Sequence, residues 1–196
     1  MMLERTGIVL AGGLSTRMGR DKASLPWGGV DLLHNVLRSL VPVCGQLIVV
    51  SNVERAINIP DVIVVRDKYC GCGPLGGIHA GLSVSMSTYN FVVACDMPFV
   101  QSSLVDYMFR LAEGYDAVVP FVDGHYHPLH AIYSRQCLAL IEIMLKDGRY
   151  RVAELFEELN MLLVKKGDLK EFDRDCSMLC NLNSPADVEK VLKNNE

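Results

Sequence analysis

The chain has 196 residues, of which 50% are hydrophobic and 21% are charged, and its formal net charge is −4 at pH 7. No apolar stretch approaches the roughly 18 residues of a membrane span, and the lysines and arginines are scattered instead of forming the basic stripe of a nucleic-acid groove. We therefore expect neither a membrane protein nor a nucleic-acid-binding protein. The length predicts a single domain over residues 1–196. The acid-containing N-terminal segment leads directly into a glycine pair and leaves no room for a secretory signal, which predicts a cytoplasmic protein.

Apolar runs alternate with segments of helical spacing along the chain. Strands are predicted at residues 7–10, 47–50, 62–65, 91–95, 117–120 and 129–133. Helices are predicted at residues 32–40, 76–84, 103–111, 136–145, 152–159 and 185–192. The first four strands are continuous apolar runs, which favours burial on both faces. The alternation predicts an α/β fold, doubly wound, with a mostly parallel sheet and helices on both faces. The charged residues 165–175 are predicted to form a surface connection.

The first predicted strand runs into the segment LAGGLSTRMGRDK, from Leu10 to Lys22. Gly12 and Gly13 let backbone N–H groups approach a ligand where a Cβ would obstruct it. The cations that suit a triphosphate follow at Arg17, Arg20 and Lys22. The glycine spacing fits neither a Walker A loop nor the dinucleotide fingerprint G-x-G-x-x-G. The segment therefore predicts a phosphate-binding loop of another type, and the alternative is a turn with solvated basic side chains.

Polar residues or glycines also follow the next predicted strands. The residues after the first four strands are Gly12 and Gly13, Ser51 and Asn52, Arg66 and Asp67, and Asp96. In a parallel sheet, ligands bind outside the carboxyl ends of the strands. The sequence therefore predicts one site at that edge.

Asp96 is the candidate metal ligand. A triphosphate needs a divalent cation, and Mg²⁺ commonly takes only one or two protein carboxylates and completes its shell with water and phosphate. One aspartate at a strand end is therefore sufficient. The alternative is that Asp96 caps the turn before Met97 and Pro98.

The seven cysteines do not predict a disulfide framework, because the count is odd and no secretion signal is expected. Neither Cys70 and Cys72 nor Cys176 and Cys180 form the C-x-x-C pairs of a structural zinc site. We expect reduced thiols. Cys70 and Cys72 are the exceptions, because they lie in a predicted active-site loop, where thiols can oxidise or bind a metal.

Five segments in order along the chain resemble those of the molybdenum cofactor guanylyltransferases, within a wider family of nucleotidyltransferases that includes cytidylyl and sugar-nucleotide enzymes. They are LAGGLSTRMGRDK from Leu10, Asp67 with Gly73-Pro74-Leu75-Gly76-Gly77, ACDMPF from Ala94, the HPLHAIY stretch from His127, and NLNSP from Asn181. The resemblance covers nearly the whole chain.

The resemblance implies a nucleotide-diphospho-sugar transferase-like fold and transfer of GMP from GTP to molybdopterin. The pterin phosphate would attack the α-phosphorus in line and pyrophosphate would leave, with Mg²⁺ as cofactor and no protein nucleophile. Catalysis is assigned to Lys22, Arg17 and Asp96, with Asp96 as the metal ligand. Contacts to GTP are assigned to Leu10, Ala11, Gly12, Gly13, Lys22, Asn52, Asp67 and Asp96. Contacts to molybdopterin are assigned to Arg17, Gly19, Gly73, Gly77, Asn181 and Asn183. The implied protein partners are those that supply molybdopterin and the molybdoenzymes.

For two groups of residues, the sequence allows both a functional and a structural interpretation. Asn181 and Asn183 alternate on an extended stretch and suit the edge of a pterin ring, but Asn183 also suits the start of a helix. His125, His127 and His130 suggest a metal cluster, whereas the adjacent Asp123-Gly124 predicts a hairpin turn, with His127 shaping the pterin side.

Two other functions remain open from the sequence. The form LAGG instead of LAAG favours guanylyl over cytidylyl transfer by resemblance alone, so a CTP-dependent enzyme is the alternative. A protein that carries GTP or molybdopterin without catalysis is the second alternative, although a pure carrier would need neither a metal ligand at the α-phosphate nor a cation shared by both substrates.

Overall fold

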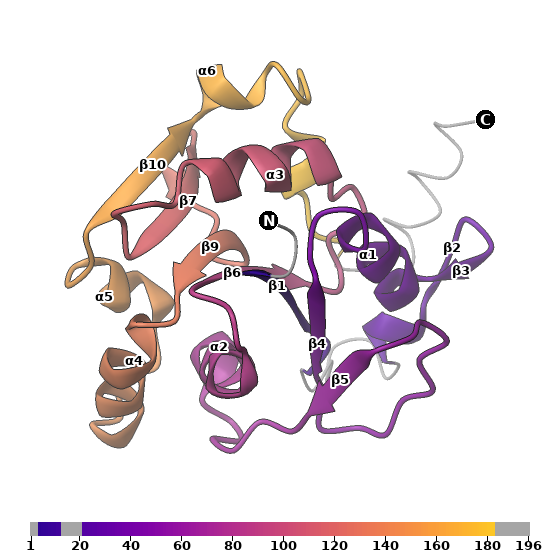
Figure 1. Ribbon diagram of the computed structural model, residues 1–196, viewed down its shortest axis with the longest axis horizontal. Coiled ribbons are helices and arrows are strands. Elements are labelled where there is room, and N and C mark those ends of the chain that lie inside the picture. The colour runs from indigo at the N-terminus through magenta and orange to yellow at the C-terminus, as the bar shows by residue number, and fades with distance from the viewer. Residues whose placement is uncertain (1–3, 13–20, 183–196) are drawn as a thin grey trace.

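The structure is a computed structural model that describes residues 4–12 and 21–182, and it shows one central sheet with helices on both faces (Figure 1). The sheet has the strand order β10-β7-β9-β6-β1-β4-β5, with β8 paired to β7. Its strands are β1 (Arg5–Leu10), β4 (Gln46–Val50), β5 (Val62–Val65), β6 (Tyr89–Ala94), β7 (Ala117–Val122), β8 (His125–Tyr126), β9 (His130–Ser134) and β10 (Met161–Lys165). A separate two-stranded ribbon consists of β2 (Pro26–Trp27) and β3 (Val30–Asp31).

The strands β5, β4, β1 and β6 are parallel, and β9 runs antiparallel to both of its neighbours, β6 and β7. Because the direction reverses at β9 and again at β7, β7 and β10 run the same way as β1. The sheet is therefore mostly parallel, as the sequence predicts.

Six α-helices are described, together with the 3₁₀ helices Lys22–Ser24 and Ser177–Leu179. The α-helices are α1 (Leu32–Leu40), α2 (Gly73–Val84), α3 (Ser102–Arg110), α4 (Cys137–Lys146), α5 (Val152–Phe156) and α6 (Lys166–Leu169). Helix α1 begins where the Asp31 carboxylate accepts a hydrogen bond of 2.8 Å from the backbone N–H of His34. Helix α2 begins with Gly73 and Pro74, and proline is well suited to the first turn because its missing N–H needs no partner there.

The core has two layers, one on each side of the sheet. Helices α1 and α3 pack on one face, and α2, α4 and α5 pack on the other. The side chains of β1 alternate between the layers: Val9 faces α1 and α3, whereas Ile8 and Leu10 face α2. A Cβ at Gly81 of α2 would collide with Ile8, so the glycine permits close contact between helix and strand.

The predicted strands and the first five predicted helices are confirmed, with bounds that differ by a few residues. Strand β5 differs in burial, because it lies at the sheet edge and leaves Ile63 and Val64 40% and 45% exposed. The expectation that it is buried on both faces is therefore wrong. The segment 165–175 is not only a surface connection either, since it contains α6 with the fully buried Leu169. The predicted helix 185–192 lies outside the described residues. Within the described part, no helix has the length and apolar character needed to cross a membrane.

Candidate functional site

Hydrogen bonds continue beyond the carboxyl ends of the parallel strands and align the residues that follow. The N–H of Ala11 donates to the carbonyl of Val50 over 2.9 Å, and the N–H of Cys95 donates to the carbonyl of Leu10 over 3.1 Å. On the outer side, the N–H of Ser51 donates to the carbonyl of Val65 over 2.9 Å. Four strand ends thus form one continuous edge, which we call the carboxyl rim of β5, β4, β1 and β6. The convergence predicted from the sequence is confirmed.

Lys22 and Asp96 meet at this rim. The Nζ atom of Lys22 lies 2.9 Å from Oδ2 of Asp96, with the two side chains 22% and 14% exposed. The other carboxylate oxygen, Oδ1, is buried and has no hydrogen-bond partner among the described residues. A buried carboxylate oxygen without a partner is costly unless a ligand binds it. The turn after β6 is closed by the N–H of Met97 donating to the carbonyl of Ala94, so the Asp96 side chain is not needed as its cap.

A small apolar cluster fixes the segments on both sides of this ion pair. Leu25 and Trp27, which follow Lys22, pack with Leu32, Leu182 and the half-buried Phe99, which follows Asp96. The rings of Trp27 and Phe99 meet edge to face with centroids 5.4 Å apart. The N–H of Leu182 also donates to the backbone carbonyl of Asp96 over 2.8 Å, which brings the exposed Asn181 to the border of the site.

Asn52 and Asp67, both predicted to contact the nucleoside, lie beside each other at the β4–β5 end of the rim. The side-chain oxygen of Asn52 accepts a hydrogen bond of 2.9 Å from the N–H of Asp67, and its amide donates to Sγ of Cys70 over 3.7 Å. The Asp67 carboxylate accepts from the N–H of Tyr69 over 2.8 Å. A Cβ at Gly76 would lie 2.8 Å from this carboxylate, so the glycine of α2 makes room for it.

The glycines predicted to contact molybdopterin occupy different environments. Gly73 is exposed at the start of α2 with a φ of +66°, a conformation that favours glycine. Gly77 is buried, and a Cβ there would lie 3.2 Å from the side chain of Leu10. Gly77 therefore has a packing role that the sequence did not indicate. On the rim itself, Gly12 is exposed, and a Cβ there would lie 3.7 Å from the carbonyl oxygen of Val50, at ordinary van der Waals distance.

Arg55 is part of the rim although no motif points to it. Its guanidinium donates to Oγ of Ser51 over 2.8 Å, to the carbonyl of Ala11 over 2.8 Å, and to both carboxylate oxygens of Asp21 over 2.6 and 3.0 Å. Its side chain is only 7% exposed. Hydrogen bonding to Arg55 lowers the pKa of Asp21 below its usual value.

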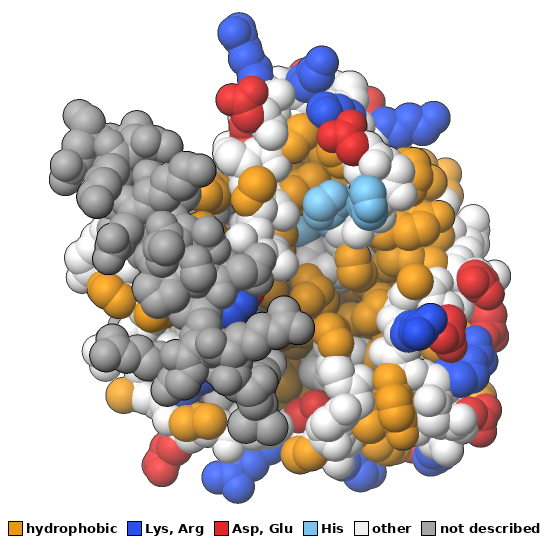
Figure 2. Space-filling view, turned by 180° about the vertical axis from the view of Figure 1, so that it is seen from behind, with side chains coloured by type: hydrophobic (Ala, Val, Ile, Leu, Met, Phe, Trp, Pro, Cys, Tyr) orange, Lys and Arg blue, Asp and Glu red, His pale blue; other side chains and the backbone are white. Residues whose placement is uncertain are grey.

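The histidines near β7 belong to a hairpin and to a core contact. Asp123 and Gly124 have φ of 49° and 83°, and they join β7 to β8 in the predicted hairpin. His130 is buried in the sheet, edge to face with Phe91 at 5.0 Å, and burial lowers its pKa to about 3. His127 is half-buried. On the face of the molecule seen in Figure 2, histidine side chains lie beside hydrophobic ones. Within the described ranges, no group of three His, Cys, Asp or Glu residues could hold a metal ion.

The cysteines are free thiols, as the sequence predicts. Cys44, Cys95 and Cys137 are buried, and burial raises the pKa of each to about 12. Cys70 is exposed at the rim, and Cys72 next to it is half-buried. The buried thiols are therefore inert core residues.

Four of the predicted site residues lie outside the described residues: Gly13, Arg17, Gly19 and Asn183. The structure places the remaining ones on or beside one rim. The sequence alone does not predict the distance between Lys22 and Asp96 or the contacts of Arg55.

The mostly parallel sheet brings Gly12, Lys22 and the partly buried Asp96 to one carboxyl rim. This arrangement defines an α/β protein of the nucleotide-binding class. Residues 7–161 match a protein family described as the MobA-like NTP transferase domain. The chain belongs to this family, and it is therefore a nucleotidyltransferase.

Similar proteins cover nearly the whole chain. A probable molybdenum cofactor guanylyltransferase of Pelotomaculum thermopropionicum is 36% identical over 97% of this chain and 93% of its own length. One of Carboxydothermus hydrogenoformans is 31% identical over 98% and 97%. The crystal structure of molybdopterin-guanine dinucleotide biosynthesis protein A from Archaeoglobus fulgidus superposes with a TM-score of 0.81 at 27% identity and covers 94% of this chain and 95% of that one.

Proposed function

We propose that this chain transfers GMP from GTP to molybdopterin, releasing pyrophosphate and forming the guanine dinucleotide cofactor. Its family membership and the names of its relatives support this reaction. The observation that carries the proposal is the meeting of Lys22 and Asp96 at the carboxyl rim, with Nζ and Oδ2 2.9 Å apart. A cation and a carboxylate at that distance offer complementary groups for a phosphate and for its metal ion.

The rim fits a divalent cation at Asp96. Its Oδ1 atom is buried and has no partner among the described residues, and a hard carboxylate oxygen is the ligand that Mg²⁺ prefers. When bound, Mg²⁺ would neutralise charge that develops on the phosphate oxygens. We propose Mg²⁺ as the cofactor and Asp96 as its protein ligand.

The other residues of the site are proposed to bind and orient. Lys22 and Arg17 stabilise the charge of the transferred phosphoryl group, and the backbone of Leu10, Ala11, Gly12 and Gly13 approaches the triphosphate. Asn52 and Asp67 contact the nucleoside. The molybdopterin side is assigned to Arg17, Gly19, Gly73, Asn181 and Asn183. The same assignment includes Gly77, which is buried at a point where a Cβ would lie 3.2 Å from Leu10.

The reaction needs no nucleophile from the protein. The phosphate of molybdopterin is already ionised and attacks the α-phosphorus itself, while the bond to pyrophosphate breaks. The contribution of this chain is therefore alignment and charge stabilisation. We place the reaction in the cytoplasm, with proteins that supply molybdopterin or receive the dinucleotide as partners.

The test is turnover of the purified chain with molybdopterin, Mg²⁺ and GTP, CTP or ATP in parallel, measured as pyrophosphate release. Selective use of GTP supports the proposal. A preference for CTP would make the chain a cytidylyltransferase, and tight GTP binding without pyrophosphate release would make it a carrier. Either of these two results overturns the proposed guanylyl transfer.

A further inference from the structure

Arg55 connects three segments of the rim that lie far apart in the sequence. Its partners are Ala11 after β1, Ser51 after β4 and Asp21 before Lys22, at sequence separations of 44, 4 and 34 residues. Arg55 donates all four of the hydrogen bonds given above, so one buried side chain holds Ala11 and Asp21 together.

The contact with Asp21 has the bidentate geometry that suits arginine. Nη1 donates to Oδ2 over 2.6 Å and Nη2 donates to Oδ1 over 3.0 Å, so the planar guanidinium fixes the plane of the carboxylate. The arginine side chain is 7% exposed and that of Asp21 is 39% exposed. A lysine could satisfy one of these acceptors but could not reproduce the fork.

Asp21 in turn fixes the backbone that carries Lys22. Its Oδ1 accepts from the N–H of Ala23 over 3.2 Å and caps the short 3₁₀ helix Lys22–Ser24, and its Oδ2 accepts from the hydroxyl of Ser24 over 3.1 Å. The turn that begins at Lys22 is thus set by the carboxylate that Arg55 holds. From this turn, Lys22 reaches Asp96.

We infer that Arg55 is a positioning residue that acts through Asp21 to hold Lys22 opposite Asp96. The inference rests on the proposed function, because it assigns Lys22 to the reacting phosphates. Arg55 does not itself bind the phosphates: its side chain is buried, and its donors face Ser51, Ala11 and Asp21. Its effect on the reaction must therefore pass through the groups that it holds.

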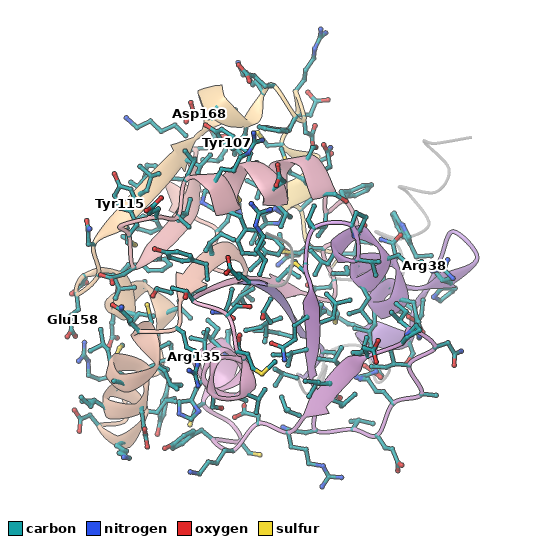
Figure 3. All side chains as sticks on the ribbon, viewed as in Figure 1. Arg38, Tyr107, Tyr115, Arg135, Glu158 and Asp168 are labelled. Atoms are coloured by element: carbon teal, nitrogen blue, oxygen red, sulfur yellow. The ribbon has the colours of Figure 1, made fainter. Side chains whose placement is uncertain are left out.

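The experiment compares Arg55→Ala and Arg55→Lys with Arg38→Ala. Arg38 is a matched control, since it is an exposed arginine at the outer edge of α1 (Figure 3). For each variant, kcat and KM for GTP are measured with molybdopterin and Mg²⁺, together with the urea midpoint of unfolding. We expect Arg55→Ala to lower kcat by about 10- to 100-fold, as small displacements of a reacting group do, and Arg38→Ala to leave kcat unchanged. Arg55→Lys should recover the unfolding midpoint more fully than kcat.

A second comparison separates positioning from a general loss of stability. The same Arg55→Ala change is made in a Lys22→Met background, and GTP affinity is measured by equilibrium dialysis in all four proteins. If Arg55 acts through Lys22, Arg55→Ala weakens GTP binding in the wild-type background and has little effect once Lys22 is absent. An equal loss in both backgrounds, or no loss of kcat in a folded Arg55→Ala or Arg55→Lys protein, would overturn the inference.

If Arg55→Ala does not fold, Asp21→Asn replaces it in the same scheme, because this change keeps the shape of the side chain and removes its charge. The expected pattern is the same, with a smaller fall in kcat. The proposed function and the proposed role of Arg55 are contradicted by results on different proteins. Wild-type protein that neither binds GTP nor releases pyrophosphate contradicts the proposed function. Active wild-type protein with additive effects of the two changes contradicts only the role of Arg55.

Discussion

Nζ of Lys22 lies 2.9 Å from Oδ2 of Asp96 across a sequence separation of 74 residues. The lysine comes from the end of the glycine segment, and the aspartate comes from the end of β6. Both side chains are mostly buried, and Lys22 compensates the charge of the Asp96 carboxylate. The pair therefore matters to folding and to catalysis, and these two contributions can be measured separately.

Asp96→Asn is expected to lower kcat by at least about 100-fold, because the amide keeps the volume but loses the charge that a metal ion requires. Binding of Mn²⁺ in the presence of GTP, followed by electron paramagnetic resonance of the free ion, should weaken in parallel. Asp147→Asn changes an exposed aspartate beyond α4 and is the matched control. Full metal binding by Asp96→Asn would exclude Asp96 as the ligand.

Lys22→Met should abolish transfer and also lower the free energy of unfolding by about 1–3 kcal/mol, because it leaves the Asp96 carboxylate without its partner. Combining it with Asp96→Asn should restore part of this free energy, since the uncompensated charge is gone, but no activity. Urea unfolding and pyrophosphate release are measured on the wild-type protein, the two single variants and the double variant. Recovery of activity in the double variant would show that neither charge takes part in the reaction.

Gly81→Ala is expected to lower the free energy of unfolding by about 1–3 kcal/mol, because the added Cβ overlaps Ile8 in the core. Gly77→Ala should cost less, since Leu10 is met only at 3.2 Å. Gly167→Ala has open space around it and serves as the control. For Gly77→Ala, KM for molybdopterin is measured as well: an increase at unchanged stability would favour a direct contact over packing.

The stability of the protein is expected to fall as the pH drops from about 6.5 towards 3. Burial lowers the pKa of His130 to about 3, so the folded protein keeps this ring neutral while the unfolded chain binds a proton near pH 6.5. His79 and His127 also have pKa values lowered by burial and act in the same direction. His130 alone should remove about 1 kcal/mol between pH 6.5 and 5.5.

His130→Phe checks this assignment, because it keeps a ring against Phe91 and removes the titrating group. The slope of the free energy of unfolding between pH 5 and 7 should become smaller in this variant. An unaltered slope in His130→Phe would mean that His130 is not buried as a neutral ring.

The sequence predicts much of this fold because most elements carry a local signal. Helix α1 has the predicted bounds, 32–40, since apolar spacing and the Asp31 cap agree there. An apolar run does not reveal whether it lies in the middle or at the edge of a sheet, which is why the exposure of β5 was not expected. Strand β10, MLLVK, was missed for a related reason, since a short apolar run after a helix has no period of its own.

The candidate site, like the fold, can be predicted from the sequence only in part. Lys22 and Asp96 each follow a predicted strand or glycine segment, so their place on the rim can be predicted, but the distance between them depends on packing by Trp27 and Phe99. Arg55 has no local signal, because Ala11 and Asp21 are 44 and 34 residues away. Its role becomes visible only when the chain is folded.

The antiparallel strand β9 changes what kind of segment can reach the rim. At every parallel strand the chain leaves the sheet at this edge, whereas at β9 it enters there, between β6 and β7. The residues just before β9 therefore sit among residues that come just after other strands, and the carbonyl of Leu129 accepts from the N–H of Ala94, two residues from Asp96. A search confined to the residues that follow strands would pass over the segment 127–129, although it borders the same rim.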